Sequence, residues 1–141
     1  MKKPCNLGND NGSLIAEESR PKIPEGEYEA ICTKTEIGKK WQRDLYHTFK
    51  IHGGKYDGLE LFMKCPFPKG RAKRNSKYYQ QWCLANNCLP AKGQRLSRKI
   101  FPNRLYLVKV RDTRRRYNNS KELLPPFLQY SVVDTIIKPL T

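Results

Sequence analysis

The chain has 141 residues, a length typical of one domain, and carries 28 Lys and Arg against 13 Asp and Glu, for a formal net charge of +15. No apolar run approaches the roughly 20 residues that span a bilayer, and the start of the chain lacks the apolar segment of a signal peptide, so we expect a cytoplasmic protein without a membrane partner. Leu, Ile, Val and Phe make up only 31 residues, so the 15 aromatic side chains must fill much of a small core.

Turn residues and hydrophobic periodicity divide the chain into a tail and one domain. Residues 1–22 are rich in Asn, Gly, Ser and Lys and are expected to form a flexible N-terminal tail, and residues 23–141 form the domain. The elements expected in the domain are, in chain order, strands over 27–37, 44–52 and 59–65, a helix over 77–88, and strands over 103–112 and 127–137.

The second and third strands have the clearest pattern. Leu45, His47, Phe49 and Ile51 alternate with polar or aromatic residues, which is the period of two of a half-buried strand. Three glycines within residues 53–58 predict a turn before the next strand. The inward side chains of that strand are Leu59, Leu61, Met63 and Cys65.

The helix is expected between two loops. Asn75 or Ser76 can cap its N-terminus and Pro90 follows its end. The residues at helical spacing are Tyr79, Trp82, Cys83 and Asn86. The resulting order is three strands, one helix and two strands. This is the order of the OB-fold, a five-stranded, partly open barrel that binds oligonucleotides or oligosaccharides on its second and third strands and on two loops. We therefore expect a mainly β, five-stranded OB-fold-like barrel with one helix between strands 3 and 4.

The positive charge is concentrated in the second half of the chain. Residues 1–60 hold ten basic and ten acidic side chains, whereas residues 61–141 hold eighteen basic and three acidic ones. Such asymmetry indicates a polyanionic partner, although a solvated surface is the alternative. No segment alternates basic and bulky apolar residues at helical spacing, which argues against a helix lying on a membrane surface.

Two loops that border the binding face of such a barrel combine cations with an aromatic residue. In the loop between strands 1 and 2 the candidate residues are Lys39, Lys40, Trp41 and Arg43. In the loop between strands 4 and 5 they are Arg114, Arg115, Arg116 and Tyr117. Lys and Arg can neutralise phosphates while an exposed ring stacks on a base, although Trp41 could instead be a core residue.

The strands and a third loop add further candidates. The period of two turns Tyr46, Lys50, Phe62 and Lys64 outward, although the tail, the helix or a second subunit could cover Phe62. The loop before the helix is also basic, with Lys69, Arg71, Lys73, Arg74 and Lys77. Phosphate contacts of this kind give affinity without sequence preference.

The cysteines and the sparse acidic residues give little support for metal chemistry or catalysis. The five cysteines are scattered along the chain, at Cys5, Cys32, Cys65, Cys83 and Cys88. Their odd number and wide spacing favour free thiols, and no Cys-x-x-Cys or matching His pair predicts a metal or another cofactor. The cluster Asp57, Glu60 and Lys64 lacks the spacing of a metal-dependent nuclease site, so we expect no enzymatic activity.

Several short segments carry a resemblance to a known group of proteins. These are residues 23–28 (IPEGEY), 49–51 (FKI), 54–58 (GKYDG), 124–126 (LPP) and 130–132 (YSV). Over residues 23–137 the chain resembles small single-stranded DNA-binding-like proteins of phages and integrative mobile elements. The resemblance implies an OB-like barrel that serves replication or recombination of such an element. The chain ends with residues 136–141 (IIKPLT) rather than with the acidic segment that recruits partners in bacterial housekeeping single-stranded DNA-binding proteins, so the resemblance does not extend to that route.

Together these patterns predict a protein that binds single-stranded DNA with little sequence preference. The sequence does not decide whether the protein also binds RNA, or whether it forms a homo-oligomer. Two other functions stay as alternatives: a structure-specific nuclease or nuclease accessory, and an interaction module for an acidic partner protein.

Overall fold

The computed structural model describes residues 14–16, 18–38, 44–67, 69–115 and 121–141. The elements are, in chain order, β1 (Gly26–Ile37), β2 (Asp44–Ile51), β3 (Glu60–Pro66), α1 (Lys77–Asn86), the 3₁₀ turn η1 (Arg98–Ile100), β4 (Arg104–Asp112), the 3₁₀ turn η2 (Pro126–Leu128) and β5 (Ser131–Pro139). The described part of the chain contains no helix long and apolar enough to cross a bilayer.

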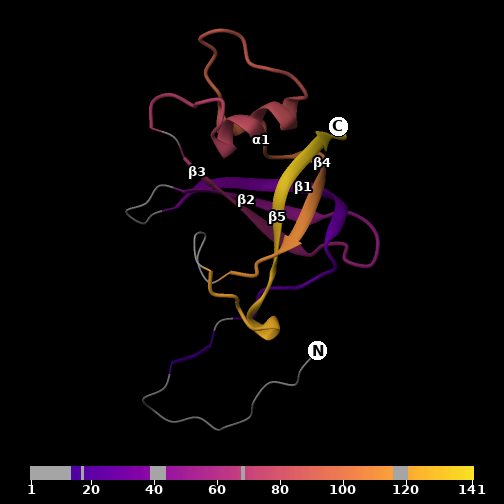
Figure 1. Cartoon of the computed structure of the whole chain (residues 1–141). Coiled ribbons are helices and arrows are strands. Elements are labelled where there is room, and N and C mark those ends of the chain that lie inside the picture. Colours follow the sequence, from indigo (N-terminus) through magenta and orange to yellow (C-terminus); the bar gives the residue numbers. More distant parts are fainter. Residues whose placement is uncertain (1–13, 17, 39–43, 68, 116–120) are drawn as a thin grey trace.

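The five strands form one antiparallel sheet in the order β3-β2-β1-β4-β5, curled strongly into a half-barrel (Figure 1). Strand β1 is shared, because its first half pairs with β4 and its second half with β2. The edge strands β3 and β5 also contact each other, so the curl brings the two ends of the sheet together. The expected mainly β fold with one α-helix between the third and fourth strands is confirmed.

An irregularity in β1 accompanies the curl. The pairing of β1 with β2 shifts register between Cys32 and Lys34. An extra residue in one strand bends that strand and increases the local twist. Strands β4 and β5 consequently run steeply across the direction of β2 and β3 (Figure 1).

Aromatic rings fill much of the core, as the composition predicts. Phe49, Phe101 and Tyr106 are fully buried, and the Phe49 and Tyr106 rings meet edge to face with centroids 6.2 Å apart. The Tyr106 hydroxyl donates to the Phe101 carbonyl over 3.2 Å, so this ring is buried without an unsatisfied polar group. The centroid of the buried His47 ring lies 4.5 Å from that of Phe101.

Helix α1 covers one end of the half-barrel and packs against β3 and β5. Ser76 caps it, since its hydroxyl accepts from the Tyr79 N–H over 3.2 Å, as one of the two expected caps. The helix ends at Asn86, two residues before the predicted end, because Asn87 adopts a left-handed conformation with φ of 53°.

The buried face of α1 differs from the predicted pattern. It consists of Tyr78, Gln81, Trp82 and Ala85. The predicted pattern included Trp82 but also Tyr79, Cys83 and Asn86, which are only partly buried. A polar residue on the buried face decides the difference, because Gln81 donates to the Thr135 hydroxyl and accepts from the Ile136 N–H, each over 2.8 Å. Gln81 thereby fixes the helix to β5.

The start of the last strand was predicted wrongly. Residues 126–128 form a 3₁₀ turn and β5 begins only at Ser131, whereas the sequence predicts a strand from residue 127. Pro126 lacks an N–H and has a fixed φ, which suits the first position of a helical turn better than a strand. Tyr130 therefore lies just before the strand.

The described cysteines are free, and burial separates them into two classes. Cys32 and Cys65 are buried in the core, where desolvation raises the pKa of each thiol to about 11. Cys83 is partly exposed and Cys88 is exposed. Within the described ranges no three His, Cys, Asp or Glu side chains gather as ligands for a metal ion.

Candidate nucleic-acid interface

The outer face of strands β2 and β3 carries aromatic and basic side chains side by side. Tyr46, Lys50, Phe62 and Lys64 are all exposed, and Tyr46 and Phe62 each keep 38% of their surface in contact with solvent. Tyr46 lies opposite Lys64 in the ladder, and Phe62 lies opposite Thr48. The expected outward orientation of these four residues is confirmed, and the core residues of both strands point the other way.

A residue of the N-terminal segment lies over this face. The Arg20 guanidinium carbon is 5.8 Å from the centroid of the Phe62 ring and 4.8 Å from that of Tyr130. Both distances are typical of cation–π contacts. The N-terminal tail was one of the segments expected to cover Phe62, and Arg20 of that tail does lie over the ring. The Phe62 side chain nevertheless remains partly exposed to solvent.

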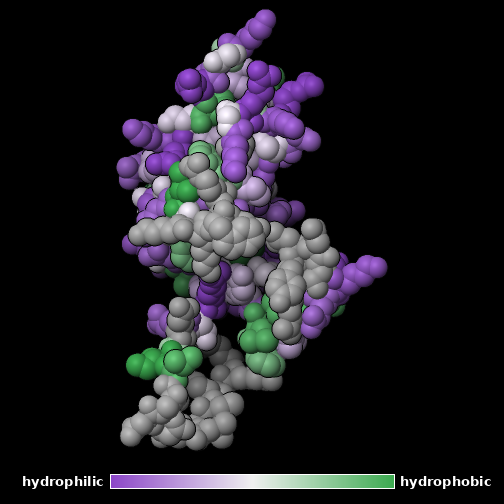
Figure 2. Space-filling view, turned by 90° about the vertical axis from the view of Figure 1, so that its left-hand side faces the viewer, coloured by the Kyte–Doolittle hydropathy of each residue, from purple (hydrophilic) through white to green (hydrophobic). Residues whose placement is uncertain are grey.

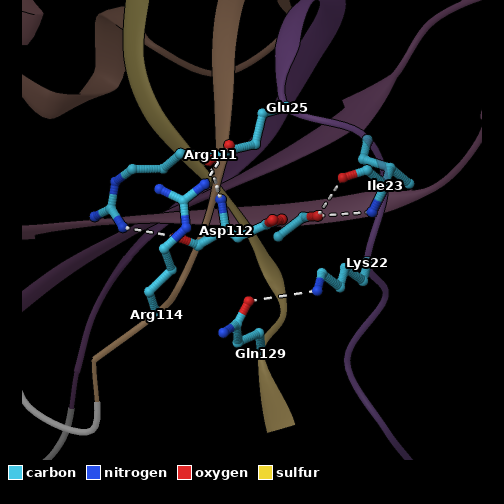
Figure 3. Close-up of polar contacts among 8 residues, drawn as sticks. Lys22, Ile23, Glu25, Arg111, Asp112, Arg114 and Gln129 are labelled. Carbon is cyan, nitrogen blue, oxygen red and sulfur yellow. Dashed lines mark hydrogen bonds and ion pairs between the residues drawn. The ribbon is translucent and has the colours of Figure 1, made fainter. Parts of the chain in front are cut away.

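Hydrogen bonds to the start of β5 fix the position of Arg20. The Ser131 N–H donates to the Pro21 carbonyl over 2.9 Å, and the Ile23 N–H donates to the Ser131 hydroxyl over 2.8 Å. Lys22 also contacts the Gln129 side chain (Figure 3). Residues 20–23 therefore lie along the start of β5. This places one more cation beside the outer face of β2 and β3, which carries Tyr46 and Phe62 and which we call the aromatic face.

A groove of about 670 Å³ lies between β3 and the connection from β4 to β5. We call it the basic groove, and its lining cations are Lys64, Lys77, Arg111, Arg114 and Arg115. Its other lining residues are Pro66, Asp112, Thr113, Leu123, Tyr130, Val132 and Val133. The groove adjoins the outer face of β2 and β3, because the exposed Lys64 belongs to both and Arg20 contacts Tyr130 as well as Phe62.

Carboxylates balance part of the charge in the basic groove. Lys64 Nζ lies 3.6 Å from Asp44, Arg111 Nε lies 2.9 Å from Asp134, and Arg114 is paired with Glu25. These ion pairs are partly exposed to solvent, where such pairs contribute little to stability. A phosphate can therefore compete for the same cations at small cost.

Glu25 joins the N-terminal segment to the end of β4. Its carboxylate accepts from the Asp112 N–H over 3.0 Å and from Arg114 (Figure 3). The hydrogen bond from the Asp112 backbone, together with the charge of Arg114, holds the pKa of Glu25 below its usual value. Glu25 thus orients Arg114 at the rim of the basic groove.

A second cavity, of about 1100 Å³, lies between the loop before α1 and the loop after it. We call it the basic cleft, and its lining cations are Lys69, Arg71, Lys92 and Arg95. Phe67, Tyr78 and Tyr79 supply aromatic walls. Figure 2 shows a mostly hydrophilic surface over the end of the molecule that carries α1.

The structure brings some of the predicted site residues together and separates others. Lys64, Arg114 and Arg115 meet in the basic groove, and Phe62 and Tyr46 lie on the adjoining face. Lys50 is at the opposite end of the same strand pair, where it faces Glu60. Arg71 lines the basic cleft, and Lys73 and Arg74 are exposed on the same loop without lining either cavity. Six further predicted residues lie outside the described residues: Lys39, Lys40, Trp41, Arg43, Arg116 and Tyr117.

Three residues of the basic groove and the aromatic face were missed by the sequence analysis. Arg111 alternates with Val108 and Val110 in β4, so the period of two could have identified it as an outward cation. Arg20 and Tyr130 lie ahead of the first strand and of the last strand. No local pattern places these two beside Phe62, because the contact depends on the curl of the whole sheet.

The residues considered for a nuclease site have separate structural roles. The Asp57 carboxylate accepts from the Gly53 N–H over 2.6 Å, which stabilises the turn between β2 and β3. Glu60 lies opposite Lys50, and Lys64 is paired with Asp44.

Comparison with known proteins adds no homologue: no protein-family model matches the chain, and no curated protein is significantly similar to it.

Proposed function

We propose that this protein binds single-stranded DNA with little sequence preference, on an OB-fold-like barrel. The observation that carries the proposal is that the basic groove adjoins the aromatic face at Lys64, with Arg20 in contact with both Phe62 and Tyr130. A nonspecific single-strand site combines a positively charged groove for the phosphate backbone with exposed rings for the bases. The described residues supply both in adjoining positions.

The topology supports the choice of scaffold. Strand β1 pairs with both β2 and β4, the edges β3 and β5 approach each other, and α1 follows β3. An OB-fold barrel uses the same order of elements, and it binds its ligands across strands 2 and 3. In this protein the exposed Tyr46, Phe62 and Lys64 occupy that face.

The binding geometry follows from these positions. Phosphates would lie along Lys64, Lys77 and Arg115 in the basic groove, and bases would stack on Phe62 and Tyr130. Arg20 covers both rings in the free protein, and its guanidinium group can pair with a phosphate when a base takes its place. The same side chain would therefore protect the rings before binding and contribute charge afterwards.

A role in replication or recombination of a phage or other mobile element is the biological part of this proposal. It depends on the sequence resemblance over residues 23–137. It also depends on the fact that a protein in replication or recombination can bind single strands without recognising a particular base sequence. A protein that coats transiently exposed single strands needs affinity without sequence preference, which phosphate contacts and ring stacking supply.

A gel-shift experiment tests the proposal. Single-stranded DNA, duplex DNA and RNA of equal length are compared at two salt concentrations, with Lys64→Gln as the groove variant and Lys109→Gln as the control. Lys109 is exposed on β4 and lies outside the basic groove. Its substitution therefore makes the same change in charge without touching the proposed site. We expect the protein to bind single-stranded DNA most tightly. Lys64→Gln should weaken this binding, and Lys109→Gln should leave it unchanged. Preference for the duplex, or equal losses in both variants, would refute the proposed site.

A further inference from the structure

The basic cleft differs from the basic groove in the balance of its charges. Its four cations come from the loops on either side of α1, and none of its lining residues is acidic. Residues 61–111 contain thirteen Lys and Arg and no Asp or Glu. The ion pairs Lys34–Glu36, Lys64–Asp44, Arg111–Asp134 and Arg114–Glu25 involve no residue of the cleft. In the groove, by contrast, Lys64, Arg111 and Arg114 are each paired with a carboxylate.

The two cavities share a wall. Pro66 and Lys77 line the basic groove, and the next residues along the chain, Phe67 and Tyr78, line the basic cleft. The end of β3 and the start of α1 therefore border both cavities. A strand that followed these two segments out of the groove at Lys77 would next meet the cleft.

The shape and lining of the cleft fit an extended polyanion. Arg71 and Lys69 lie on one side, and Lys92 and Arg95 lie on the other, so cations border the cleft on both loops. The Tyr79 ring, which is partly exposed, offers a surface for a base between them. The volume of about 1100 Å³ is larger than that of the groove.

We infer that the basic cleft is a second segment of the nucleic-acid path, in which a single strand that leaves the basic groove over Lys77 places its next phosphates between Arg71 and Arg95. The inference rests on the proposed function and extends it, because it assigns the loops around α1 to binding and sets the length of strand that one molecule covers. Barrels of this type cover from about 4 to about 16 nucleotides, and the cleft would place this protein toward the upper end.

The test uses fluorescence anisotropy with labelled oligothymidylates of two lengths, about 5 and about 15 nucleotides, which bracket the range for one barrel. The cleft variant is Lys92→Gln combined with Arg95→Gln, both exposed residues whose replacement removes no buried contact. The matched control is Arg98→Gln combined with Lys99→Gln, which makes the same change in charge on the exposed turn η1 outside the cleft. Circular dichroism checks that all variants fold.

We expect the cleft variant to weaken binding of the long oligonucleotide only. Two lost phosphate contacts would reduce the steepness of the salt dependence by about 1.4, which corresponds to roughly twentyfold weaker binding at about 0.1 M salt. The short oligonucleotide and the control variant should keep the affinity of the original protein. If the long oligonucleotide binds the cleft variant and the control equally, while Lys64→Gln still weakens both lengths, the path through the cleft is refuted and the proposed function stands. Failure of the unaltered protein to bind either length would refute the proposed function itself.

Discussion

The salt dependence of binding gives the most direct measure of the basic groove. Five cations line it: Lys64, Lys77, Arg111, Arg114 and Arg115. Each phosphate neutralised on a single strand contributes about −0.7 to the slope of log affinity against log salt concentration, so full use of the groove predicts a slope of about −3.5. The double substitution Lys64→Gln and Lys77→Gln should reduce the slope to about −2.1.

A short oligonucleotide is the correct probe for this measurement, since it limits binding to the groove. Fluorescence titrations from about 50 to about 200 mM salt cover the range in which such slopes are usually compared. The single variant Lys109→Gln, on the outer side of β4, serves as the control and should keep the original slope. A flat salt response, or a slope that the double substitution leaves unchanged, would refute the assignment of these cations to phosphate binding.

The remaining predictions concern stability and stacking. Burial, with a further contribution from the charge of Lys77, lowers the pKa of His47 from 6.5 to about 4, so the unfolded chain binds more protons between these values. The contribution of neutral His47 to the free energy of unfolding should be fully present above pH 6.5 and should fall by about 3 kcal/mol as the pH drops to about 4. Urea unfolding of the original protein over this pH range should show the loss, and His47→Gln should not show it. Ser76→Ala should cost about 1 kcal/mol of unfolding free energy, because it removes the N-cap of α1; no change in the urea midpoint would contradict that role. Phe62→Ala should weaken single-strand binding by about 1–3 kcal/mol with an unchanged salt slope, whereas an altered slope at equal affinity would argue against stacking.

Local sequence patterns accounted for the strands and for the faces of their side chains. The alternation around Phe49 and Met63 placed both in the core and turned Phe62 and Lys64 outward, because side chains on successive residues of a strand point to opposite faces. The pattern failed where the backbone departed from regular geometry. Pro126 began a turn where a strand was expected, so the position of Tyr130 could not be deduced from hydrophobicity alone.

Only the tertiary structure decided which of these surfaces adjoin. The sequence by itself determined the excess of basic residues, their concentration after residue 60 and the outward placement of the aromatic strand residues, since composition and a period of two are properties of the chain. The contact of Arg20 with both Phe62 and Tyr130, and the meeting of Lys64 with Arg114 across the basic groove, join segments far apart in sequence. The curl of β1 and the packing of the aromatic core bring β3 to β5, and that long-range closure has no local signature in the chain.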